Sequence, residues 1–205
     1  MTPTIAAALA LAAAPGDPSE LRPPAPGVIL DHPARALDRR RVRVQTGGMA
    51  LLTAWSIANL GGGLAGNLVV PAGRDARYFH QMNWAWNTVN LTLGAVGLAG
   101  ARRDHRRARP RPRGAVLQDI TRAQRVFAVN ALLDVVYMVG GYATWEIGKD
   151  RESPRLRGYG QAVVLQGAFL LAFDLAMIFA HEPPRLALAP LAAPGARGLA
   201  LAGRF

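Results

Sequence analysis

The stretch QAVVLQGAFLLAFDLAMIFA, residues 161–180, decides the fold of this chain. It contains one charged residue, Asp174, and no proline. An α-helix needs about 20 predominantly apolar residues to cross the hydrocarbon core of a bilayer. A barrel strand is about half as long and alternates apolar with polar residues, which this stretch does not do. Because a helix also satisfies its own backbone hydrogen bonds in lipid, the stretch predicts a transmembrane helix.

Three similar blocks precede it, over residues 47–70, 81–101 and 126–145. None contains a proline, and Asp134 is their only charged residue. Short connections separate the first block from the second and the third from the fourth, so these neighbours should run antiparallel. The sequence therefore predicts an all-α fold, a transmembrane up-down four-helix bundle.

The domain predicted from these blocks, residues 47–182, is flanked by segments of different composition. Residues 1–46 comprise an apolar leader followed by a Pro- and Arg-rich stretch that we expect to be irregular. Residues 183–205 are biased towards Ala, Leu, Pro and Gly, which predicts a disordered tail. Residues 1–14, MTPTIAAALALAAA, are similar to the core of a signal peptide, although no basic residue precedes them.

The distribution of positive charge predicts the orientation in the membrane. The chain has a net charge of +11, and 18 of its 24 basic residues lie in the N-terminal segment, the middle connection and the tail. This bias places both termini in the cytoplasm and the protein in the cell (inner) membrane of a bacterium. A cleaved signal peptide would instead place the mature N-terminus outside, so the two signals conflict, and we follow the larger one. The chain has no cysteine, which excludes disulfides.

The Arg-rich middle connection, residues 102–125, has two interpretations. It can anchor the topology and contact anionic lipid, or it can bind nucleic acid. No aromatic residue interleaves with the arginines to stack on bases, so we predict lipid and no nucleic acid. The expected partners are therefore the bilayer and its anionic lipids, and self-association or a second membrane protein stays open.

Polar residues at membrane depth are the candidates for function. In the second block four of them are spaced 3, 4 and 3 residues apart and fall within an arc of about 80° on a helix. The third block has a stripe spaced 4 and 3, and the fourth has two polar residues. Facing lipid is costly for such side chains, so each stripe should face the bundle interior. The tentative ligand-binding residues are His80, Asn83, Asn87, Asn90, Asn130, Asp134, Tyr137, Gln166 and Asp174.

Two carboxyl groups stand out among these residues. With a rise of about 1.5 Å per residue, Asp134 and Asp174 lie roughly 13 Å and 9 Å from the same face of the membrane. Two buried carboxylates close together cannot both ionise cheaply, so a proton, a cation or water is expected there. The alternative is that the polar axis only holds the helices together by hydrogen bonds. An enzyme is the least favoured hypothesis, because no nucleophile–base pair is apparent.

No cofactor or metal site is predicted. The four histidines are His32, His80, His105 and His181. Two of them lie outside the predicted spans, and the other two lie at opposite faces of the membrane, so no pair can share a haem iron. No phosphate-binding loop and no H-E-x-x-H or G-x-S-x-G motif is present.

Four segments carry a resemblance to a known family: MALLTAWSIANL (49–60), YFHQMNWAWNTVNL (78–91), NALLDVVYMVGG (130–141) and RLRGYGQAVVLQGAFLLAFDLAM (155–177). Over roughly residues 45–180 the chain resembles an uncharacterised family of small bacterial four-helix membrane proteins. The resemblance implies the four-helix fold and a polar pattern shared within the family. It implies no activity, and it leaves out the Arg-rich connection and the tail.

Overall fold

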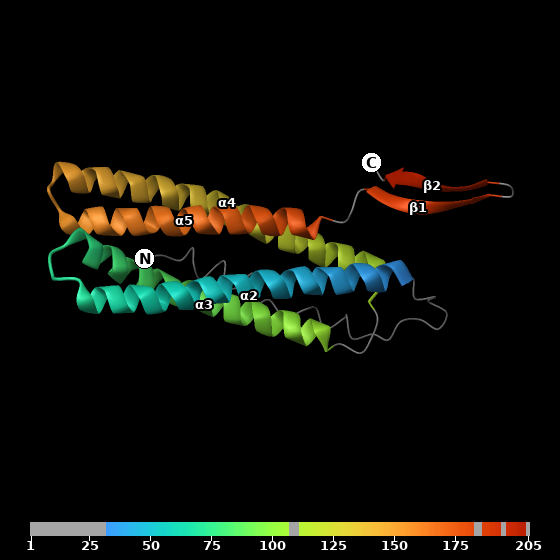
Figure 1. Ribbon diagram of the computed structural model, residues 1–205, viewed down its shortest axis with the longest axis horizontal. Helices are drawn as coiled ribbons and strands as arrows, with labels where there is room; N and C mark the ends of the chain where they lie inside the picture. Colours follow the sequence, from blue (N-terminus) through green and yellow to red (C-terminus); the bar gives the residue numbers. More distant parts are fainter. Residues whose placement is uncertain (1–31, 107–110, 183–185, 194–195, 204–205) are drawn as a thin grey trace.

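The computed structural model describes residues 32–106, 111–182, 186–193 and 196–203. Over these residues it has four long helices followed by two strands (Figure 1). The helices are α2 (His32–Val69), α3 (Asp75–His105), α4 (Arg113–Asp150) and α5 (Pro154–His181). The strands are β1 (Leu186–Ala193) and β2 (Ala196–Gly203). The predicted four-helix fold is therefore confirmed, and the predicted leader at residues 1–14 lies outside the described residues.

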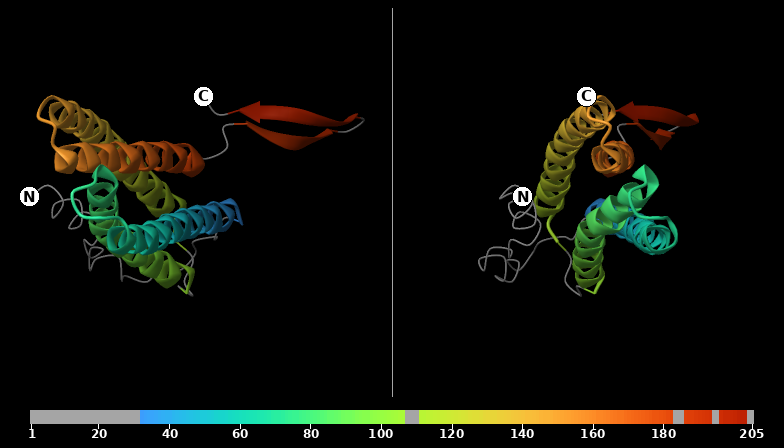
Figure 2. Two further views of the ribbon diagram at one scale, coloured as in Figure 1. Left: turned by 60° about the vertical axis from the view of Figure 1, so that its left-hand side comes forward. Right: turned by 90° about the vertical axis from the view of Figure 1, so that its left-hand side faces the viewer.

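The helices form two antiparallel pairs. One pair is α2 with α3 and the other is α4 with α5, and the two pairs meet mainly through α3 and α5. A view along the bundle places the pairs on opposite sides (Figure 2, right). The short connections α2–α3 and α4–α5 lie at one end, which we call the short-loop end (Figure 1). The end that holds the start of α2 and the start of α4 is called the arginine-rich end.

All four helices extend beyond the apolar blocks, which corrects the predicted boundaries. The prediction that residues 1–46 are irregular is wrong for residues 32–46, which form the first turns of α2. Most of the supposed connection at 102–125 is also helical, because α3 ends at His105 and α4 begins at Arg113. Pro33 is the last proline of residues 1–46, and Pro112 is the last proline of residues 102–125. The residues that follow each of them include the helix formers Ala, Leu and Arg. Apolar length alone therefore underestimated the helices.

The C-terminal segment also differs from its prediction. Instead of a disordered tail, β1 and β2 pair antiparallel, from Leu186 opposite Gly203 to Ala193 opposite Ala196. Both strands alternate leucine with alanine or glycine over much of their length, and that period of two fits a strand better than a helix. The compositional bias that suggested disorder concealed this alternation.

Glycines allow the closest helix contacts. A Cβ added to Gly160 on α5 would lie 2.5 Å from the backbone nitrogen of Trp145 on α4. A Cβ added to Gly158 would lie 2.2 Å from the backbone oxygen of Asp75 on α3. No larger residue fits at either position, so α5 is held close to both of its main neighbours. Such backbone proximity is typical of helices that associate in membranes.

The bundle has an apolar core around Met49, Phe127 and Phe173, but it also buries several polar side chains and exposes many large apolar ones. Buried residues include amides and acids, among them Asn87 and Gln166, both fully buried. Large apolar side chains point outward, for example Leu68, Val69 and Leu132, which are 72%, 78% and 67% exposed. Two of the described helices, α4 and α5, are long and apolar enough to cross a membrane.

Candidate functional site

A cluster of amide side chains joins three helices in the half of the bundle towards the short-loop end. At its centre Gln166 of α5 donates from Nε2 to Oδ1 of Asn83 on α3, at 2.7 Å. Its Oε1 accepts from Nε1 of Trp55 on α2, at 3.1 Å. The same Nε2 lies 3.4 Å from Oδ1 of Asn59, also on α2. Because each bond crosses between helices, this cluster fixes their relative register.

The amide cluster continues along α3. Nδ2 of Asn87 donates to the backbone oxygen of Asn83, at 2.9 Å, and Nδ2 of Asn90 lies 3.4 Å from Oδ1 of Asn87. All three asparagines are buried. Residues three or four positions apart lie on the same face of a helix, which explains why these asparagines lie together. The asparagines of the stripe expected from the sequence therefore do face the interior.

Two carboxyl groups lie between α4 and α5, apart from the amides. Asp134 and Asp174 are 3% and 4% exposed, and their carboxyl groups are near enough to interact directly. Oδ2 of Asp134 is buried and has no hydrogen-bond partner among the described residues. The backbones are close here too, because a Cβ on Gly167 would lie 3.2 Å from the backbone oxygen of Asp134. The two acids predicted to be neighbours are therefore brought together.

The remaining predicted residues do not join either group. Tyr137 is half-buried, and its ring packs edge-on against Trp86 of α3 with 5.1 Å between centroids. His80 is half-buried with its ring close to Gly66 of α2. Asn130 is also only partly buried. Of the nine predicted residues, His80, Asn130 and Tyr137 thus border the interior without entering the buried polar groups.

Trp55 is a member of the amide cluster that was not predicted. Its indole stacks on Phe169 of α5 with 3.8 Å between ring centroids, which aims Nε1 at Gln166. A tryptophan in an apolar block is normally interpreted as a packing residue, so the residue type alone did not indicate that Trp55 would donate a hydrogen bond to Gln166. The spacing from Trp55 to Asn59, one helical turn, was the available clue.

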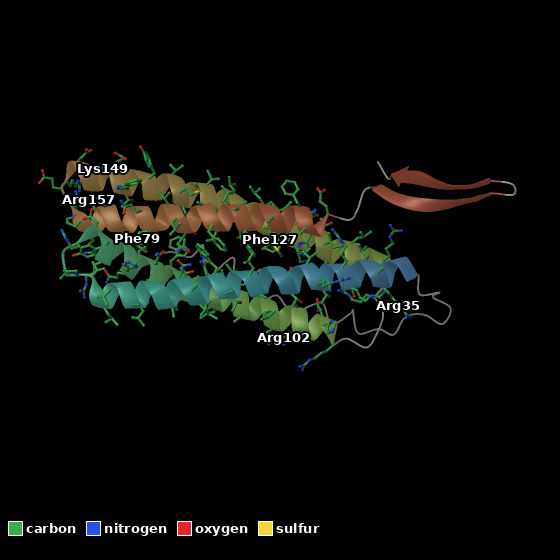
Figure 3. All side chains as sticks on the ribbon, viewed as in Figure 1. Arg35, Phe79, Arg102, Phe127, Lys149 and Arg157 are labelled. Atoms are coloured by element: carbon green, nitrogen blue, oxygen red, sulfur yellow. The ribbon has the colours of Figure 1, made fainter. Side chains whose placement is uncertain are left out.

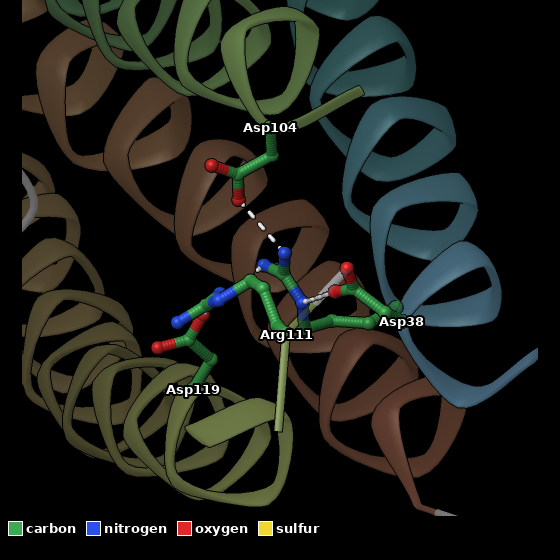
Figure 4. A network of polar contacts seen from close by, with 5 residues as sticks. Asp38, Asp104, Arg111 and Asp119 are labelled. Atoms are coloured by element: carbon green, nitrogen blue, oxygen red, sulfur yellow. Dashed lines mark hydrogen bonds and ion pairs between the residues drawn. The ribbon is translucent and has the colours of Figure 1, made fainter. Parts of the chain in front are cut away.

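An ion cluster at the arginine-rich end was also not predicted (Figure 4). Its centre is Arg41 of α2, whose side chain is 9% exposed. Arg41 pairs with Asp38 at 2.9 Å, with Asp104 of α3 at 2.8 Å and with Asp119 of α4 at 3.6 Å. The cluster therefore ties three helices together beyond the apolar blocks.

Arg111 completes this cluster from the connection between α3 and α4, where it pairs with Asp119. Burial alone would lower the pKa of Arg111, but the bond to Asp119 and the charges of the neighbouring aspartates raise it above its ordinary value. The aspartates that pair with the arginines lie in the two segments described above as Arg-rich. An excess of arginine concealed the acidic residues that pair with it.

Comparison with known proteins gives one match. The model of DUF6992, a family of unknown function, matches residues 51–175. This range includes the amide cluster and the carboxyl pair. No curated protein and no solved structure matches the chain significantly.

Proposed function

This chain belongs to DUF6992, a family of unknown function, and from its own residues we propose that it is a multi-pass membrane protein that holds a proton at Asp134 and Asp174. One observation carries the membrane part of the proposal: amide and acid side chains are buried between the helices, while many large apolar side chains are exposed on the outside. Lipid is the solvent in which that arrangement is favourable, because buried amides and acids find partners and exposed Leu and Val need no water.

All four helices are proposed to cross the bilayer. α4 and α5 are long enough and apolar enough to cross a membrane. α2 and α3 are more polar, but the polar side chains Ser56, Asn83, Asn87 and Asn90 are buried in the bundle. The outward residues of α2 are apolar, for example Leu51, Ile57 and Leu64, whereas α3 exposes Val96 together with Thr88 and Thr92. Composition therefore understates how well these two helices suit lipid.

The proton belongs to the carboxyl pair. Within residues 126–145 and 161–180 there is no Lys, Arg or His to neutralise either acid. Two ionised carboxylates in contact repel each other, and burial deprives them of hydration. One shared proton is therefore favoured, because it reduces the charge of the pair from −2 to −1. The buried oxygen of Asp134 that has no partner is the acceptor that such a proton would satisfy.

A second candidate function is structural, and the amide cluster favours it. Gln166 uses both its donor and its acceptor, and each bond reaches another helix. Amides that are fully hydrogen-bonded in this way need no ligand, and each interhelical bond contributes about 0.6–2 kcal/mol. The amide cluster is thus assigned to helix packing, and the carboxyl pair alone to proton binding.

Infrared spectroscopy of the reconstituted protein tests the proton. We expect wild-type protein at neutral pH to show the C=O band of a protonated carboxylic acid in an apolar environment, and Asp174→Asn to remove it. Asp75→Asn is the control and should leave the band in place, because Asp75 pairs with Arg157 at 2.8 Å near the surface and is not part of the carboxyl pair. A wild-type spectrum without the band, from correctly folded protein, would show that the pair holds no proton.

The orientation follows from charge. Arg35 and Arg102 lie towards the arginine-rich end, and Lys149 and Arg157 towards the short-loop end (Figure 3). The former end has more basic residues, so we assign it, with both termini, to the cytoplasm of a bacterial cell and its membrane to the inner membrane. Exposed arginines there would contact anionic lipid headgroups; they include Arg102, Arg103, Arg106, Arg113, Arg122 and Arg125.

Cysteine labelling in intact cells tests this orientation, because the natural chain has no cysteine. Ala72→Cys, in the α2–α3 connection, should react with a membrane-impermeant maleimide. Arg106→Cys, after the end of α3, should react only once the cells are opened. The reverse pattern would place both termini outside and would favour the cleaved signal peptide.

A further inference from the structure

An open groove runs along the outer surface between α2 and α5, with a volume of about 410 Å³. Small and aromatic residues make up much of its lining. The residues that form it include Gly47 and Gly48 of α2, with Phe169, Ala172, Phe173 and Ala176 of α5. It is not part of the amide cluster or the carboxyl pair.

Gly47 creates much of this space. A Cβ added at Gly47 would meet nothing within 4 Å, whereas one at Gly48 would lie 2.2 Å from the sulfur of Met177. Gly48 is therefore a packing glycine, and Gly47 faces the open groove. A larger side chain at Gly47 would fill the groove without forcing α2 away from α5.

A cation lies at one end of the groove. Arg43 lines it one turn before Gly47, is exposed, and forms no ion pair among the described residues. Arg40, one turn earlier on the same face, donates from Nη1 to the backbone oxygen of Glu182 at 2.7 Å. The apolar block of α2 begins at Gly47, so Arg43 stands at the boundary between the proposed membrane core and the headgroups.

We propose that this groove binds one anionic phospholipid, with an acyl chain along Gly47 and Ala172 and the headgroup phosphate at Arg43. The proposal rests on the membrane location argued above. The apolar lining suits a hydrocarbon chain, and a guanidinium suits a phosphate, to which it can donate two parallel hydrogen bonds. The arginine-rich end faces the cytoplasmic leaflet, where anionic lipids are enriched.

The dimensions favour a lipid over a second copy of the chain. A volume of about 410 Å³ lies within the range of roughly 300–1,000 Å³ typical of small-molecule sites. Eleven residues line the groove, fewer than the roughly 20–30 residues that each partner contributes to a standard protein interface. An uncharged partner helix would also leave Arg43 without a counter-ion.

Native mass spectrometry of the full chain in detergent, titrated with phosphatidylglycerol or phosphatidylcholine, tests the proposal. We expect one phosphatidylglycerol per chain, bound about tenfold more tightly than phosphatidylcholine, which corresponds to one charge-assisted contact. Gly47→Leu should weaken both lipids about tenfold by filling the groove. Arg43→Gln should weaken phosphatidylglycerol more than phosphatidylcholine and so reduce the preference between them, because the choline cation already offsets the phosphate charge that phosphatidylcholine presents to Arg43.

Two matched controls separate these effects from general changes. Gly61→Leu adds the same side chain at another open position of α2, and Arg151→Gln removes an exposed charge after the end of α4, at the opposite end of the bundle; both should bind lipid like wild type. Equal binding by Gly47→Leu and wild type would overturn the proposal. So would a dimer that Gly47→Leu dissociates, because a second copy would then occupy the groove. A chain that is monodisperse without detergent would instead overturn the membrane location itself.

Discussion

Gly160→Ala is expected to destabilise the folded protein by about 3 kcal/mol, the upper part of the range for overpacking. The added Cβ would lie 2.5 Å from the backbone nitrogen of Trp145 and 2.6 Å from the backbone oxygen of Gly141. Backbone atoms cannot rotate away, so α5 would have to separate from α4 along its length. That separation would also disturb the contact between Asp134 and Asp174, which depends on the same closeness.

The matched control is Gly140→Ala on α4, because a Cβ there meets nothing within 4 Å. Alanine is the better helix former, so this control should be neutral or more stable by up to about 1 kcal/mol. Thermal unfolding in detergent, followed by circular dichroism, compares the two variants. Equal transition temperatures for Gly160→Ala and Gly140→Ala would show that α4 and α5 are not as close as described.

Arg41→Gln is expected to cost about 3 kcal/mol of stability, the lower end of the range for breaking a buried ion pair. The side chain of Arg41 is 9% exposed, and its removal leaves Asp38 and Asp104 near one another without their shared cation. The aspartates are more exposed than Arg41, at 26% and 20%, so water offsets part of the loss. The start of α2 should detach from the end of α3.

Hydrogen exchange followed by mass spectrometry measures this effect locally. Residues 32–46 should exchange faster in Arg41→Gln, while the amide cluster around Gln166 keeps its protection. Lys149→Gln is the control, because Lys149 pairs with Glu146 on an exposed surface and contributes about 0–1 kcal/mol. Unchanged exchange over 32–46 would mean that the ion cluster does not hold α2 in place.

The helices of the central domain could be predicted because length and local periodicity carry the information. Residues 161–180 are apolar enough for a helix whatever surrounds them, and Asn83, Asn87 and Asn90 share a face in any helix. Their burial was expected on that ground. Residues 32–46 could not be recognised in the same way, because their helical structure is supported by Arg41, which bonds to Asp104 at a separation of 63 residues.

Amino-acid order thus accounts for the helices at the four apolar blocks, for which of their faces are polar and for where charge accumulates, since these properties depend on residues a few positions apart. The pairing of Gln166 with Asn83, the selection of Gly160 for the α4–α5 contact and the groove beside Gly47 depend on how each helix is rotated and shifted against its neighbours. Packing sets that rotation over distances the local sequence does not encode, so these features emerge once all four helices are assembled.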